Sequence, residues 1–182
     1  MLIASAPYTT HCFGAMGETI ETARQTDFFQ WFHFEETERH VEGPGEAARF
    51  RPSGEKFHDL CYLDVMATGT GKMILLELVV ERAFLDGGNR LFAQDLVKSF
   101  LFSTLPDACR DGLSDFLQEM NVPGGHGKTL GYQVFSGRQN EWRAETGWSR
   151  LVLANVSPAG IPSLVVHMGA NPTAPNSRLI EE

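Results

Sequence analysis

The sequence predicts an α+β domain, with a mainly antiparallel sheet of five to seven strands and two consecutive helices packed on one face. Three observations lead to this fold class. Two β-rich runs flank a Gly-Thr turn within residues 57–86, two helix-periodic segments follow, and nearly continuous apolar runs come last. We expect one domain over residues 1–169 and a flexible tail over residues 170–182, where Pro and Asn are frequent.

The composition supports a domain with its own core and narrows the classes of partner. Of 182 residues, 42% are hydrophobic, and 15 Lys+Arg against 23 Asp+Glu give a net charge of −8. Nucleic acid is therefore not an expected partner, because phosphate binding needs clustered basic side chains. The apolar runs are interrupted by Glu within a few residues, so we expect no membrane span.

The three cysteines are isolated from one another and form no paired motif. Cys12, Cys61 and Cys109 lack the spacing of a zinc or redox site, and the first residues lack the basic segment of a secretion signal. We therefore expect a cytoplasmic protein whose thiols are small buried hydrophobes.

The N-terminal half begins with an aromatic segment. Phe28–Phe34 has aromatic residues at both even and odd positions, which predicts a strand whose two faces are both covered. Residues 35–56 are charged and contain Gly-Pro-Gly and Pro-Ser-Gly, which predicts a loop, either a flap or a simple connection.

Residues 57–86 give the clearest pattern of the chain, two alternating runs around Thr68-Gly69-Thr70-Gly71. Successive side chains of a strand point to opposite faces, so the length of the loop decides which side chains of the two strands share a face. A two-residue loop at Gly69-Thr70 or Thr70-Gly71 buries only apolar residues on one face. That choice stacks one set of three residues over a set of four: Cys61, Leu63 and Val65 over Ile74, Leu76, Leu78 and Val80.

The same register collects the polar residues of this hairpin on its other face. These residues are the candidate catalytic set: His58, Tyr62, Asp64, Glu77 and Glu81. A carboxylate beside an imidazole can raise the pKa of the imidazole and fix one tautomer, as general acid–base catalysis requires. The alternative interpretation is a solvated sheet face with ordinary cross-strand pairs.

Two helices and two or three strands complete the predicted domain. Phe92, Leu96 and Phe100 recur at spacing four, and Thr104–Asp107 resembles a capping box before a second helix. The buried stripe of that second helix is expected to contain Cys109, Leu113, Phe116, Leu117 and Met120. The closing strands are expected at Tyr132–Phe135, Gly147–Val156 and Ile161–Met168.

Two Gly-rich segments carry a lysine. Residues 66–73 resemble the phosphate-binding loop of helicase-like ATPases, but Met73 replaces the hydroxyl residue and a period-two run follows the lysine. We therefore predict a hairpin turn there, since a phosphate loop must open a helix. Gly124–Thr129 precedes an expected strand, and we interpret it as a linker, with an anion nest as the alternative.

These patterns favour a binding function over chemistry. No His, Cys or carboxylate spacing is that of a known metal site, so we expect neither metal nor cofactor. The leading hypothesis is a soluble binding domain for a protein partner or a small apolar ligand, with Trp31, His33 and Phe34 as candidate ligand-binding residues. One alternative is a small hydrolase or isomerase that uses the hairpin's polar face. Another is a structural subunit of a homo-oligomer, with the aromatic strand at a homodimer seam.

Overall fold

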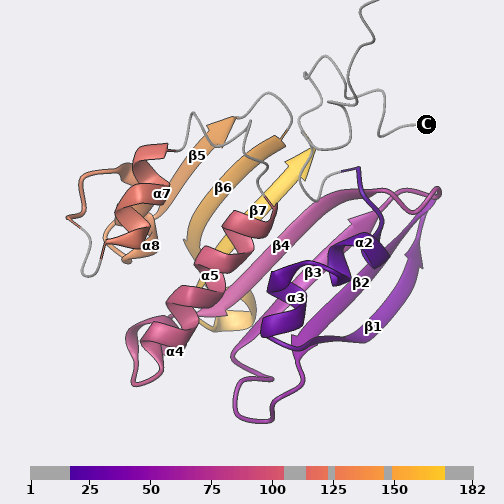
Figure 1. The fold of residues 1–182 in the computed structure, drawn as a ribbon, viewed down its shortest axis with the longest axis horizontal. Coiled ribbons are helices and arrows are strands. Elements are labelled where there is room, and N and C mark those ends of the chain that lie inside the picture. The colour runs from indigo at the N-terminus through magenta and orange to yellow at the C-terminus, as the bar shows by residue number, and fades with distance from the viewer. Residues whose placement is uncertain (1–16, 105–113, 123–125, 146–148, 171–182) are drawn as a thin grey trace, which may run out of the picture.

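The computed structural model describes residues 17–104, 114–122, 126–145 and 149–170. Its centre is one antiparallel sheet of seven strands in the order β1-β2-β3-β4-β7-β6-β5 (Figure 1). The strands are β1 (Phe34–Glu42), β2 (Gly45–Pro52), β3 (Cys61–Ala67), β4 (Met73–Glu81), β5 (Glu141–Glu145), β6 (Ser149–Val156) and β7 (Ser163–Ala170). The predicted α+β class with an antiparallel sheet is confirmed.

The described α-helices cover one face of the sheet, and four of them link β4 to β5 along the chain. They are α2 (Ile20–Arg24), α3 (Asp27–Trp31), α4 (Arg82–Asp86), α5 (Arg90–Thr104), α7 (Ser114–Asn121) and α8 (Leu130–Phe135). The short 3-10 turn η2 (Pro158–Gly160) joins β6 to β7. The longest, α5, crosses in front of the central strands (Figure 1). Its apolar stripe of Leu96, Val97, Phe100 and Leu101 is buried, as its spacing predicts.

The hairpin of β3 and β4 has the predicted faces. Cys61, Leu63 and Val65 lie opposite Val80, Leu78 and Leu76. All six side chains are buried. The turn Thr68–Gly71 opens no helix, which confirms the hairpin interpretation of residues 66–73.

Two parts of this register prediction are wrong. The loop has three residues and not two, because Thr68 N donates to Lys72 O at 2.9 Å and pairs these two residues across residues 69–71. A bulge at Met66 and Ala67 shifts the pairing, so that Ala67 lies opposite Met73. A bulge adds one residue to one strand and exchanges the faces of the residues beyond it. Met73 is therefore fully buried, whereas Ile74 is only partly covered.

The expected strand at Phe28–Phe34 is also wrong. Residues 27–31 form α3, and only Phe34 begins a strand. Asp27 lies in the first turn of α3, where a negative charge stabilises the helix dipole. Phe28 packs its ring on Phe32 one turn later and on Phe100 of α5. Phe28 and Phe29 are buried by this helix packing, whereas Trp31 is exposed.

The expected loop at residues 35–56 contains a hairpin, β1 and β2, joined at Gly43-Pro44. Its strand pattern is hidden because β1 is an edge strand whose side chains are mostly exposed, which permits charge at nearly every position. In β2 the alternation is visible, since Ala48, Phe50 and Pro52 are buried between charged neighbours.

The C-terminal half differs from expectation at one element and adds another. Tyr132–Phe135 belongs to α8, not to a strand, because the Thr129 hydroxyl accepts a hydrogen bond from Tyr132 N and caps a helix. The described part of the Gly124–Thr129 segment, residues 126–129, therefore leads into a helix. The additional element is β5, which was not predicted.

The remaining elements agree with the predictions where the structure describes them. Strands β6 and β7 correspond to the two apolar runs. Phe116, Leu117 and Met120 of α7 are buried, as the predicted stripe requires. Cys109, Leu113 and most of the proposed capping box lie outside the described residues, as does the predicted tail beyond Ala170.

Candidate functional site

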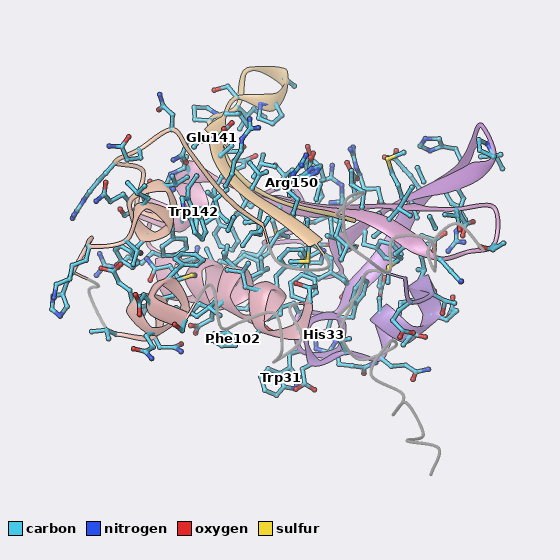
Figure 2. All side chains as sticks on the ribbon, turned by 90° about the horizontal axis from the view of Figure 1, so that it is seen from above. Trp31, His33, Phe102, Glu141, Trp142 and Arg150 are labelled. Carbon is cyan, nitrogen blue, oxygen red and sulfur yellow. The ribbon has the colours of Figure 1, made fainter. Side chains whose placement is uncertain are left out.

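The sheet has one face packed on helices and one that carries charge. Figure 2 shows α5 and the side chains of Trp31 and Phe102 on one side of the sheet, with Arg150 on the other. Side chains directly opposite each other on neighbouring strands share a face. The register therefore aligns a row of polar residues across the second face, here called the polar row: Glu38, Arg49, Asp64, Glu77 and His167.

Arg49 and Asp64 form the strongest contact of the polar row. Arg49 Nε and Nη2 donate to the two carboxylate oxygens of Asp64 at 2.6 and 2.7 Å. These hydrogen bonds raise the pKa of Arg49 above its ordinary value. The guanidinium also lies 4.2 Å from the centre of the Tyr62 ring, and that of Arg51 lies 5.2 Å from it. Desolvation raises the pKa of the Tyr62 hydroxyl.

His167 and Glu77 form the second pair of the polar row. The Nδ1 atom of His167 lies 3.1 Å from Oε2 of Glu77. Glu77 also lies opposite Asp64, and two carboxylates side by side repel each other. Arg49 and His167 therefore flank the two acidic side chains and compensate this repulsion from both sides.

Two shallow pockets adjoin the polar row and share Arg49. The first, of about 320 Å³, combines charged Glu38, Asp64 and Glu77 with apolar Met66 and Leu75. The second, of about 230 Å³, lies beside Arg51, Tyr62, Val79, Glu81 and Ile161. Both pockets are therefore lined by charged and by apolar side chains, here called the charged rim and the apolar floor of each pocket.

The structure gathers part of the candidate catalytic set. Tyr62, Asp64 and Glu77 share the charged face, as the hairpin register predicts, and Glu81 lies farther along it beside the second pocket. His58 precedes β3 in a turn, where Nδ1 lies 3.0 Å from the carboxylate of Asp59. The imidazole beside Glu77 is therefore His167 and not His58. Whether these residues perform chemistry stays a prediction.

The three candidate ligand-binding residues do not converge on one pocket. Phe34 is buried against Phe28, with ring centres 4.8 Å apart. Trp31 is 69% exposed on the helical side, next to a shallow depression that Phe102 also lines. His33 is exposed with a φ of 49°, at the junction between α3 and β1.

Sequence reasoning missed Arg49, Arg51 and His167. A usable signal existed for the two arginines, because Arg49-Phe50-Arg51 has the alternation of a half-buried strand. His167 is a single polar residue in the run Leu164–Met168. Such a residue on a central strand indicates a polar neighbour on the next strand, which here is Glu77.

Neither a thiol nucleophile nor a metal cluster is found at this face within the described ranges. Cys61 is buried on the opposite face, and burial raises the pKa of its thiol to about 12. A thiol with that pKa stays protonated and is a poor nucleophile. The described residues contain no group of three or more His, Cys, Asp or Glu side chains that could hold a metal ion.

The lysine-bearing segment before α8 holds an internal carboxylate. The backbone N–H groups of Lys128 and Thr129 donate to Glu119 at 2.6 and 2.8 Å, and the Thr129 hydroxyl donates at 2.6 Å. Desolvation raises the pKa of Glu119, but these bonds and one from the His126 backbone lower it below its ordinary value. The segment therefore forms an anion nest whose anion comes from α7.

Comparisons with known proteins give no relatives for this fold and site. No protein-family model, curated protein or solved structure matches the chain. In the part of the chain that the structure describes, no helix is both long enough and apolar enough to cross a membrane.

Proposed function

We propose that this protein is a non-catalytic binding domain, and that the polar row with its two pockets holds an extended segment of a partner protein. The observation that carries the proposal is the composition of this sheet face. Charged side chains that are already paired with one another stand beside apolar floors formed by Met66, Leu75 and Val79.

The pairing of the charges favours binding over reaction. The Asp64 carboxylate already accepts two hydrogen bonds from Arg49, and Glu77 contacts His167, so these groups are held in fixed positions. Arg51 donates to the His58 carbonyl at 3.0 Å, and no described carboxylate forms an ion pair with it. Preformed polar groups around an apolar floor give specificity to a partner without large rearrangement.

The shape favours a peptide segment over a small apolar ligand. The two pockets lie on either side of the polar row, along the direction of strands β2, β3 and β4. An extended chain laid along the strands would meet both pockets, whereas a small apolar molecule would meet charged rims in either one. The small number of cysteines and the absence of a paired cysteine motif in the sequence support the further proposal that this binding takes place in the cytoplasm.

A library of random 12-residue peptides displayed on phage tests the proposal. Peptides selected on the wild-type protein are expected to share a motif, and their affinities can be measured by fluorescence anisotropy. Leu75→Arg places a long charged side chain on the apolar floor and is expected to weaken binding at least about tenfold, the loss of roughly 1.4 kcal/mol. Leu91→Arg is the matched control, since Leu91 is 71% exposed on α5.

Two outcomes would contradict the proposal. Either the selection yields no shared motif, or Leu91→Arg weakens binding as much as Leu75→Arg does. Circular dichroism of both variants establishes that each one is folded.

A second candidate function is a small hydrolase or isomerase, and the His167–Glu77 contact favours it. A carboxylate-bound imidazole next to a pocket can act as a general base on water or on a carbon acid. A panel of chromogenic esters and phosphoesters tests this candidate. Turnover by the wild type that is lost in His167→Gln would support this candidate. Wild-type turnover no higher than that of the variant would exclude it for these substrate classes.

A further inference from the structure

Strand β1 is an edge of the sheet, and its outer side is free of any described strand. It runs for nine residues, Phe34–Glu42, and pairs only with β2 among the described strands. Val41 near its end is 82% exposed. An edge strand presents a row of unpaired N–H and C=O groups that another strand can use. What β1 can pair with depends on the order of its side chains.

A bulge fixes which side chains of β1 share a face. Glu36 lies opposite Phe50, which is buried under the helices, but Glu38 lies opposite Arg49 on the polar row. Thr37 is therefore the extra residue. Before it the even-numbered residues face the helices, and after it the odd-numbered residues do. The helix-facing residues are Phe34, Glu36, Arg39 and Val41, and those on the charged face are Glu35, Glu38 and His40.

This arrangement makes β1 complementary to a second copy of itself. An antiparallel pair with a two-fold axis between Thr37 and Glu38 places Glu36 opposite Arg39, Glu35 opposite His40 and Phe34 opposite Val41. Each pair joins residues of the same face, occurs twice, and opposes no like charges. In an unbulged strand these residues would have opposite parity and could not meet under a two-fold axis perpendicular to the sheet.

Intrachain contacts already hold the charges in this position. Arg39 Nε and Nη2 donate to Glu36 at 2.8 and 2.7 Å, and Nη1 donates to Glu46 at 2.9 Å. Around the two-fold axis these contacts and their copies would join into one network. A shift of the register by two residues would instead place Glu35 opposite Glu38, where two carboxylates repel.

We propose that this protein forms a homodimer through antiparallel pairing of β1 with β1 of a second copy, in the register that pairs Glu36 with Arg39. The dimer continues the sheet across two chains and leaves the polar row of each copy on the same outer face. This inference goes beyond the proposed binding function and does not depend on it. The other edge strand, β5, is only five residues long. If two copies of β5 paired antiparallel about their centres, Arg143 would lie opposite Arg143 of the second copy, and the two charges would repel.

Sedimentation equilibrium over a wide concentration range, combined with charge reversal, tests the dimer. Glu36→Arg and Arg39→Glu each turn two attractive pairs into repulsive ones and are expected to raise the dimer dissociation constant about tenfold or more. An equal mixture of the two variants restores complementary pairs only between unlike chains. Native mass spectrometry is therefore expected to show the mixed dimer in excess over either homodimer.

Glu141→Arg is the matched control, because Glu141 forms an exposed ion pair with Arg143 on the opposite edge strand. It is expected to leave the dissociation constant unchanged, and circular dichroism checks the fold of every variant. A wild-type chain that stays monomeric at all concentrations would overturn the proposal. So would a dimer that both reversals leave intact, or a mixture of variants that forms no mixed dimer.

Discussion

Asp64 and Glu77 lie directly opposite each other on neighbouring strands, and each carboxylate has its compensating partner on the outer side. Asp64 accepts two hydrogen bonds from Arg49, and Glu77 contacts His167. Strands β2 and β7 thus supply a hydrogen-bonding or ion-pair partner on either side of these two acidic members of the polar row.

Removal of Arg49 is therefore expected to destabilise the sheet. Arg49→Gln leaves Asp64 facing Glu77 without its bidentate partner, and we expect a loss of about 1 kcal/mol in the free energy of unfolding, since both side chains are partly exposed. Urea denaturation measures this loss. The double variant Arg49→Gln with Asp64→Asn is expected to recover part of it, because it removes the carboxylate repulsion as well. Equal stability of the single and double variants would contradict this explanation.

The two faces of β4 give a second prediction. Leu78 is fully buried under the helices, whereas Leu75 lines the first pocket on the charged face. Leu78→Ala is expected to lower the free energy of unfolding by roughly 3 kcal/mol, and Leu75→Ala by less than about 1.5 kcal/mol, because only the first leaves a closed cavity. Denaturant titration of both variants measures the loss in the free energy of unfolding when the same Leu→Ala change is made on the two faces of one strand. Similar losses would mean that the assignment of the faces is wrong.

The carboxylate of Glu119 joins α7 to the N-terminus of α8. Glu119→Gln replaces with a neutral amide the charged acceptor of the hydrogen bonds donated by Lys128 N, Thr129 N and Thr129 Oγ1. We expect the free energy of unfolding to fall by about 2 kcal/mol, the range for hydrogen bonds to a charged group. Glu21→Gln serves as the control, since Glu21 is exposed on α2. A loss no larger than that of the control would argue against a structural role for this nest.

The same carboxylate makes stability depend on pH. Desolvation alone would raise the pKa of Glu119, but the hydrogen bonds from Thr129 and Lys128 bring its folded-state pKa below the ordinary value of 4.5. As pH falls, the unfolded chain takes up the proton first, so the contribution of Glu119 is fully present above that value and is lost below it. The stability difference between wild type and Glu119→Gln is thus expected to shrink on acidification from pH 4.5. A difference that stays constant would contradict the lowered pKa.

The thiol of Cys61 is expected to be unreactive in the native protein. Burial raises its pKa to about 12, so the thiolate is scarce at neutral pH. In a variant with Cys12 and Cys109 replaced by Ser, a thiol-specific chromogenic disulfide should react with Cys61 only after denaturant is added. Rapid reaction without denaturant would place Cys61 at an accessible position and reopen its candidacy as a nucleophile.

Local sequence patterns predicted the elements in which buried residues recur with the period of a strand or of a helix. The β3–β4 hairpin has one apolar face, and α5 has one apolar stripe, so both follow directly from the spacing of residues such as Leu63, Leu78 and Leu96. Strand β1 has no buried stripe along most of its length, which made it resemble a loop. The aromatic residues of the short helix α3 have a high β-propensity and therefore predict a strand. The packing of Phe28 on Phe100 of α5 overrides that propensity.

The candidate site could be predicted only within the hairpin. Parity placed Tyr62, Asp64 and Glu77 on one face, since they belong to neighbouring strands with a short loop. His167 is 90 residues from Glu77 in the chain, and the two meet because β7 inserts beside β4. Nothing in the local pattern of either segment specifies that pairing. Arg49 lies outside the predicted site for a simpler reason, because the charge and the Gly and Pro content of residues 35–56 predict a loop there.

The position of β7 between β4 and β6 has a consequence for biosynthesis. Strands β1 to β4 can pair in sequence as they leave the ribosome, and β5 can pair with β6, but only the last described strand unites the two groups. Until residues 163–170 emerge, the edge of β4 away from β3 stays open, and its apolar side chains lack their neighbours on β7. A nascent chain halted before this segment would expose an unpaired strand edge, which other strands can use as a template for aggregation.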